Sequence, residues 1–242
     1  MPGELVNGGA VPIQEMDWQM SCDQETFEKC RHDEKFPYIV ALGRAVNTIT
    51  FMHSAMKYPV NDNSPAAKRG RLNSYLFGSA IMYEALGLVR NMGKAFVDDE
   101  LYQNGLRLIL KEDIAKNIES AHLKPARHGA VFHFDADRFK ETIDNQPPYE
   151  CLFVSARGNS RMGTAYSYSD IVSAEILVGF PAAGDKFEPV FADAVKQTSA
   201  LVTKFADQAE PLIASHLKHW GFVITSQPVP TEPASPENLP SG

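Results

Sequence analysis

Cysteine is scarce in this sequence, and the few cysteines present are not arranged as a metal centre or a disulfide framework requires. Three occur among 242 residues, Cys22, Cys30 and Cys151, and no two of them form a Cys-x-x-Cys pair. Structural zinc sites use such pairs, and disulfide-stabilised domains use a larger, even set of cysteines. The cysteine pattern therefore excludes a four-thiolate zinc site and a disulfide framework.

An excess of basic residues is also lacking. The chain holds 23 Lys and Arg against 30 Asp and Glu, which gives a formal net charge of -7. A protein that binds nucleic acid through its overall charge is strongly basic, because it has to neutralise phosphates. That class is excluded, and any contact with nucleic acid has to come from a local patch.

Long apolar runs are absent as well. The longest apolar stretch, residues 38–52, is interrupted by Arg44 and Asn47, whereas a membrane-spanning helix needs about 20 consecutive apolar residues. The segment MPGELVNGGAVPIQEMDW lacks the basic flank and the apolar core of a secretory signal. We therefore expect no membrane association and a cytoplasmic location.

What the sequence does contain is a series of apolar stripes with helical spacing. After Pro37, which suits the first turn of a helix, Ile39, Leu42 and Val46 recur at intervals of three and four. Only residues 151–154, a short apolar run, are candidates for a strand or a buried loop. The same spacing predicts helices over about 24–57, 66–97, 101–110, 114–123, 126–134, 166–178 and 187–220, the last with a kink or a restart at Pro211.

These stripes predict an all-α, bundle-like fold with at most one short strand pair. We expect a single domain over residues 21–225, because no linker-like composition divides it. Residues 1–20 carry Gly and Pro without a period and predict a disordered arm. Residues 226–242 hold five prolines and predict a disordered Pro-rich tail.

The sharpest local motif is the segment Arg127-His128-Gly129-Ala130-Val131-Phe132-His133. Pro125 predicts a helix start that places Arg127 in the first turn, where unpaired backbone N–H groups and the helix dipole favour an anion. A guanidinium binds a phosphate through two parallel hydrogen bonds, and an imidazole titrates near neutrality and can move a proton. Together these are the groups that cleavage of RNA by its own 2′-hydroxyl needs, without a metal.

The spacing within the motif constrains how these groups can meet. Six residues correspond to about 600° of helical rotation, so Arg127 and His133 lie roughly 120° apart around one helix. Two copies of the helix that face each other across a dimer can bring the groups together. Gly129 favours such an arrangement, since a missing side chain lets two helices approach closely.

The motif resembles the signature of HEPN (higher eukaryotes and prokaryotes nucleotide-binding) domains, which is an Arg, a polar residue, a spacer and a His on a late helix of an all-α domain. The resemblance covers roughly residues 36–145 in helix order. It implies a metal-independent endoribonuclease without a cofactor, acting on RNA as a homodimer in a bacterial defence or toxin–antitoxin system with an antitoxin or regulatory protein. By resemblance Arg127 and His133 are catalytic and His128 is the polar companion, where the family most often has Asn or Asp.

Other basic residues are candidates for contacts with RNA phosphates. Lys68, Arg69 and Arg71 form the main basic cluster, at the start of the helix expected over 66–97, and the alternative is a solvated helix start. Arg157 and Arg161 lie in a Gly- and Ser-containing segment that we expect to be a surface loop. These five residues are the predicted substrate-binding set.

The motif also has structural interpretations. His133 lies among apolar neighbours and is a candidate core histidine, while Arg127 is a candidate for an ion pair with Asp135 or Asp137. Glu84 lies beside apolar residues, which favours an ion pair with Arg127 or Arg71. A non-catalytic helical protein that binds a nucleotide or a protein partner is therefore the competing function.

Two further motifs do not support a cofactor or a metal. Residues 158–164 resemble a phosphate-binding loop, but the lysine that should precede the final threonine is missing. His128, His133, Asp135 and Asp137 are suitable ligand types, but two histidines five residues apart lie on different faces of a helix. We therefore expect no metal and no cofactor.

Overall fold

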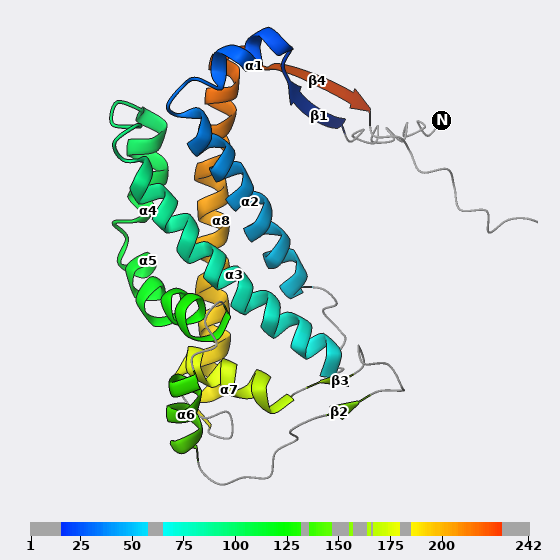
Figure 1. The fold of residues 1–242 in the computed structure, drawn as a ribbon, viewed down its shortest axis with the longest axis vertical. Coiled ribbons are helices and arrows are strands. Elements are labelled where there is room, and N and C mark those ends of the chain that lie inside the picture. The colour runs from blue at the N-terminus through cyan, green and yellow to red at the C-terminus, as the bar shows by residue number, and fades with distance from the viewer. Residues whose placement is uncertain are drawn as a thin grey trace, which may run out of the picture. The chain divides into compact units, whose positions relative to one another are not determined.

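A computed structural model describes residues 16–57, 65–131, 136–146, 155–156, 164–165, 167–179 and 185–228. The chain divides into two compact units. The larger is His32–His216, and the smaller consists of the described residues up to Arg31 and from Leu217 onward. Most described residues are helical, which confirms the all-α prediction (Figure 1).

The larger unit is built on three long helices, α2 (Phe36–Lys57), α3 (Pro65–Met92) and α8 (Phe187–His219). Helices α2 and α3 pack against each other and run in opposite directions (Figure 1). As predicted, Pro37 lies in the first turn of α2 and the apolar stripe is buried, with Ile39 and Leu42 at most 2% exposed. The helix expected over 24–57 is instead two helices, because turns interrupt it at residues 31–35.

Helix α8 supplies the longest buried stripe. Leu201, Phe205 and Leu212 are buried along it, at the spacings of the sequence pattern. The sequence predicted either a kink or a restart of the helix at Pro211. The restart is wrong, because α8 continues through this residue. Pro211 is exposed, so water can satisfy the carbonyl that loses its backbone hydrogen bond.

Shorter helices complete the larger unit. The polar step at residues 111–112 separates two of them, as the sequence predicts. Three turns have the wider, π-helical hydrogen-bond pattern and are labelled η. In chain order these elements are η1 (Tyr102–Leu106), α4 (Arg107–Ile109), α5 (Asp113–Ile118), η2 (Glu119–Leu123), η3 (Ala126–Val131), α6 (Ala136–Asp144) and α7 (Ser167–Val178).

One core cluster shows how the late helices join the early ones. Tyr75 and Ala80 of α3, Ala126 of η3, Leu177 of α7 and Ala194 of α8 are buried in a single cluster. The Tyr75 hydroxyl lies 3.4 Å from the hydroxyl of Thr198 on α8, and burial raises the pKa of Tyr75. Helices α7 and α8 up to residue 216 therefore complete the same bundle as α3.

The smaller unit corrects the predicted domain boundaries. Strand β1 (Met16–Ser21) pairs antiparallel with β4 (Val223–Pro228), so residues 16–20 of the expected arm and 226–228 of the expected tail are in a sheet. Helix α1 (Gln24–Cys30) follows β1, and the Asp23 carboxylate caps it by accepting from the Thr26 backbone N–H at 2.8 Å. The single domain expected over 21–225 is thus two units.

A second, shorter strand pair joins β2 (Ser155–Ala156) to β3 (Thr164–Ala165). The residues that the structure describes therefore contain two strand pairs, one more than expected. Residues 151–154, the strand candidate, lie outside the described part of the chain. Among the described helices, none combines the length and the apolar character needed to cross a bilayer.

Candidate functional site

Residues 127–131 of the motif lie on η3, in a helical stretch that is described without interruption from residue 113 to residue 131. Pro125 is inside this stretch, so the prediction that Arg127 occupies a first helical turn is wrong. The π-helical turn η2 ends at Leu123, two residues before Pro125, and a wider turn accommodates a ring that cannot donate to the carbonyl four residues earlier. Arg127 therefore lies within a helical stretch and not at the N-terminus of that stretch.

The Arg127 side chain is instead fixed by Glu84 of α3. Its Nε donates to Glu84 Oε1 at 2.5 Å, which confirms the ion pair expected for Glu84. The partner in this contact is Glu84 and not Asp137, which was also considered for Arg127. Asp135, the other alternative, lies outside the described residues. The Arg127 side chain is 25% exposed and that of Glu84 is 55% exposed, so the pair is at the surface and contributes only about 0–1 kcal/mol to stability.

His128 lies beside this ion pair and is exposed. Its ring meets that of Tyr83 edge to face, with centroids 5.4 Å apart. Tyr83, Glu84, Arg127 and His128 thus form one surface where η3 packs against α3, and we call these four residues the Arg127 patch. The patch presents a guanidinium and an imidazole from adjacent positions of the motif.

The third motif residue, His133, lies outside the described residues, as do Arg157 and Arg161. The same is true of the Lys68 side chain, although its backbone is part of α3. Their proposed roles stay predictions.

The basic cluster at the start of α3 is distinct from the Arg127 patch. Arg69 forms an ion pair with Asp170 of α7 at 3.3 Å, and burial raises the pKa of the Asp170 carboxyl while Arg69 offsets part of this effect. Arg71 is half-buried. Because residue 69 precedes residue 84 by fifteen positions, about 22 Å of helix separates this cluster from the patch. The two cannot bind the same phosphate.

Gly129 is buried, and its close contacts are within the chain. A Cβ at this position would lie 3.1 Å from Cδ of Arg138 on α6 and 3.4 Å from Cγ2 of Ile176 on α7. The missing side chain therefore lets η3 approach α6 and α7. This differs from the expected role of Gly129 in the approach of a second copy.

Arg138 and Ile176 also line a cavity of about 220 Å³ between α6 and α7, which sequence reasoning missed. One of its walls is the carboxylate side chain of Glu175, a residue only 2% exposed. A signal for it does exist, since Glu175 is the one charged residue in the apolar run IVSAEILV. The cavity is lined by Arg138, Glu141, Thr142, Asn145, Gln146, Glu175, Ile176 and Gly179.

The buried Glu175 carboxylate is held in place by a chain of side-chain hydrogen bonds. Gln146 Nε2 donates to Glu175 Oε2, and Gln146 Oε1 accepts from the Tyr168 hydroxyl at 2.7 Å. A buried charge is tolerated only with such partners. The arrangement fixes the position of a carboxyl group on one wall of the cavity.

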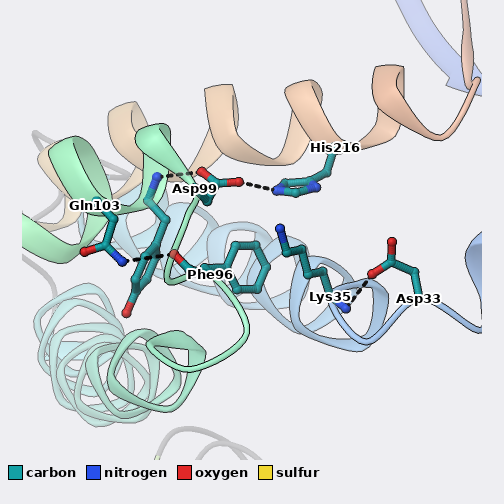
Figure 2. Close-up of polar contacts among 7 residues, drawn as sticks. Asp33, Lys35, Phe96, Asp99, Gln103 and His216 are labelled. Carbon is teal, nitrogen blue, oxygen red and sulfur yellow. Dashed lines mark hydrogen bonds and ion pairs between the residues drawn. The ribbon is translucent and has the colours of Figure 1, made fainter.

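A second buried polar pair lies elsewhere in the larger unit, between Asp99 and His216 (Figure 2). His216 Nε2 lies 2.8 Å from Asp99 Oδ2, and Asp99 Oδ1 accepts from the Tyr102 backbone N–H at 2.9 Å. The Phe96 ring meets the His216 ring edge to face. Asp99 therefore joins α8 to the start of the helical segment that contains η1, and this is a structural contact.

Within the described ranges, no group of three or more His, Cys, Asp or Glu side chains is placed to hold a metal ion. No family model matches the chain, and no curated protein and no solved structure matches it either.

Proposed function

We propose that the chain is a HEPN-like, metal-independent endoribonuclease that works as a homodimer. The observation that carries the proposal is the Arg127 patch, in which Arg127 and the exposed His128, at adjacent positions of the motif helix, contact neighbouring residues of α3. The all-α fold and the position of the motif on a late helix packed against α3 support the HEPN-like architecture. A bacterial defence or toxin–antitoxin role belongs to the same proposal.

In the proposed reaction Arg127 stabilises the charge that develops on the scissile phosphate. A guanidinium has five N–H donors, and the donation from Nε to Glu84 fixes the orientation of the group. The role of Glu84 is to position Arg127. A fixed donor needs no reorganisation as the charge develops, which is the main advantage of preorganised electrostatic groups.

The histidines move the proton. The 2′-oxygen attacks phosphorus as an imidazole removes the 2′-hydroxyl proton, and the bond from phosphorus to the 5′-oxygen breaks as that oxygen takes a proton from an imidazolium. The products are a 2′,3′-cyclic phosphate and a 5′-hydroxyl. We assign the proton transfer to His133 and the orientation of the substrate, or a share of the proton transfer, to the exposed His128.

The test is the degradation of labelled single-stranded RNA in EDTA by the wild-type chain and by Arg127→Ala, His128→Ala and His133→Ala. Loss of Arg127 or His133 is expected to lower the rate about 100-fold or more, as expected for loss of a charge-stabilising or proton-transfer group. Exposed residues away from the patch supply matched controls, namely Arg44→Ala on α2 and His219→Ala at the end of α8. Mass spectrometry identifies the cyclic phosphate.

A mixture of Arg127→Ala and His133→Ala chains tests the dimer. If residues of both copies build the site, mixed dimers contain one intact site and recover part of the activity, and light scattering gives the mass of a dimer. Wild-type rates for the Arg127 and His133 variants would refute the catalytic assignment. A rate that EDTA abolishes in the wild-type chain would replace it with a metal mechanism.

The second candidate is a binding protein of the same fold without catalysis. The ion pair with Glu84 favours it, because it neutralises Arg127, and so does the net charge of -7. In the same assays this candidate predicts that RNA is retained on a filter but is not cleaved.

A further inference from the structure

The helical segment 100–109, which consists of η1, α4 and the two residues before them, carries exposed apolar side chains. α4 lies at the edge of the larger unit (Figure 1). Tyr102, Leu106 and Ile109 form the inner face of the segment and are at most 1% exposed. Leu101 and Leu108 lie outside that face, about two turns apart, and are 43% and 41% exposed. Single exposed leucines are ordinary, so the charges beside them decide what this surface can bind.

The charges of the outer face are separated along the segment. Glu100 is at its start, Arg107 is near its end and Lys111 follows directly, and all three residues are exposed. Arg107 donates to the Gln103 side chain at 2.6 Å. Within the described ranges, none of the three charged residues is in an ion pair. The outer face is therefore acidic at one end and basic at the other.

The charges next to the segment keep this polarity. Asp98, which is exposed, adds to the acidic end. Beyond the basic end, Glu112 has its own cation in Lys204. Asp113 has its own cation in Lys116, at 3.5 Å. These two carboxylates therefore do not cancel the basic end.

A face with this pattern is complementary to itself in one orientation. In a two-fold antiparallel pair of helices, the start of each segment meets the end of the other. Leu101 of one copy then faces Leu108 of the other, and Glu100 lies beside Arg107 on each side of the axis. Asn104, which is exposed, meets its own copy near the axis, where an amide offers both a donor and an acceptor. We infer that the outer face of segment 100–109 binds a second copy of this chain in the antiparallel orientation.

The size of the face sets the expected affinity. Ten residues of helix span about 15 Å, and such a face is smaller than the roughly 800 Å² per partner that a stable interface buries. We therefore expect a weak dimer, with a Kd on the order of 100 µM. The inference goes beyond the proposed ribonuclease and does not depend on it, because the segment holds no residue of the motif. This interface is additional to the one that a composite catalytic site needs.

The apolar part of the interface is tested by sedimentation velocity of the full chain at concentrations below and above this Kd. The mass of the wild-type particle is expected to double as the concentration rises. Leu101→Lys and Leu108→Lys should weaken this step about tenfold or more, because each places an ammonium in both halves of the contact. Val40→Lys, at an exposed apolar position of α2, is the matched control and should leave it unchanged. Circular dichroism checks that each variant is folded.

Charge reversal tests the orientation. Glu100→Lys and Arg107→Glu, each alone, should weaken association about tenfold or more by placing like charges together. The two changes in one chain restore opposite charges across an antiparallel pair, so the double variant should associate more tightly than either single variant. An equimolar mixture of the two single variants should likewise associate more tightly than either alone. Residues 100 and 107 lie about 10 Å apart along one helix, so a contact within one chain does not predict this recovery.

Three results would overturn the inference. One is a wild-type mass that stays constant over the whole concentration range. Another is association that Leu101→Lys and Leu108→Lys leave at the wild-type strength, since the contact would then lie elsewhere. The third is a double charge variant that associates no better than the single variants. Because the mass is measured without RNA, these results are distinguishable from a failure of the ribonuclease proposal.

Discussion

Replacing Asp99 should lower stability by two separable amounts, because this one carboxylate makes two contacts. Asp99 Oδ1 caps the helical segment that starts at residue 100 by accepting from the Tyr102 N–H, and Oδ2 accepts from His216 (Figure 2). The side chains of Asp99 and His216 are only 14% and 10% exposed. Little solvent therefore competes for either contact.

The magnitudes follow from what each replacement leaves behind. Loss of a helix cap costs about 0.5–2 kcal/mol, and a buried imidazole nitrogen left without its partner costs about 1–3 kcal/mol. Asp99→Ala loses both contacts and should destabilise the larger unit by about 2–4 kcal/mol. Asp99→Asn keeps a capping oxygen but loses the charge, so it should cost about 1 kcal/mol.

The assay is urea unfolding at pH 7, followed by the helical circular dichroism signal. Asp98→Ala, at the exposed neighbouring position, is the matched control and should stay within about 0.5 kcal/mol of the wild-type chain. A double-mutant cycle with His216→Ala isolates the side-chain pair. If Asp99→Ala cost no more than Asp98→Ala, the contacts would not be stabilising. If Asp99→Asn cost as much as Asp99→Ala, the cap would contribute nothing.

Three further outcomes are expected. Phe205→Ala should lower the free energy of unfolding by about 3–5 kcal/mol, because the Phe205 ring is fully buried. Phe51→Ala, at a ring that is 66% exposed, should change it by less than about 0.5 kcal/mol. Equal effects of the two substitutions would contradict the burial of this face of α8. Pro211→Ala should stabilise the chain by about 1–3 kcal/mol by restoring a backbone donor within α8, and a lower melting temperature would contradict this. Burial lowers the pKa of His122 from its usual 6.5, with Asp193 opposing the shift. As the pH falls, the unfolded chain binds a proton at His122 before the folded chain does. The contribution of His122 to stability is therefore full above pH 6.5 and is lost as the pH drops toward the folded pKa. His122→Gln should reduce this loss, as measured by urea unfolding between about pH 7 and pH 5.

The helices could be predicted from the sequence where a long apolar stripe sets the period. Leu42 and Ile49 of α2 and Leu201 and Phe205 of α8 are buried as their spacing predicts. The Glu84 ion pair was also predicted, with Arg127 as one of the two partners expected. The stripes are a local signal within one element, whereas the ion pair joins α3 to η3.

The failures arise where a contact between distant segments overrides a local preference. Pro125 suits a helix start, but the surrounding helix widens at η2 and continues through it. The partners β1 and β4 are about two hundred residues apart, and neither has enough alternating residues to stand out alone. The cavity likewise requires Gln146, Tyr168 and Glu175 to come together from separate positions. The roles of His133, Arg157 and Arg161 remain predictions.

The pairing of β1 with β4 has a mechanical consequence. The outermost pair in the register is Met16 with Pro228, and the innermost is Ser21 with Val223. Tension applied through the chain at residues 16 and 228 therefore pulls on the same end of the ladder. The hydrogen bonds of an antiparallel pair loaded in this way separate one after another, like a zipper, so this small sheet should yield at low force.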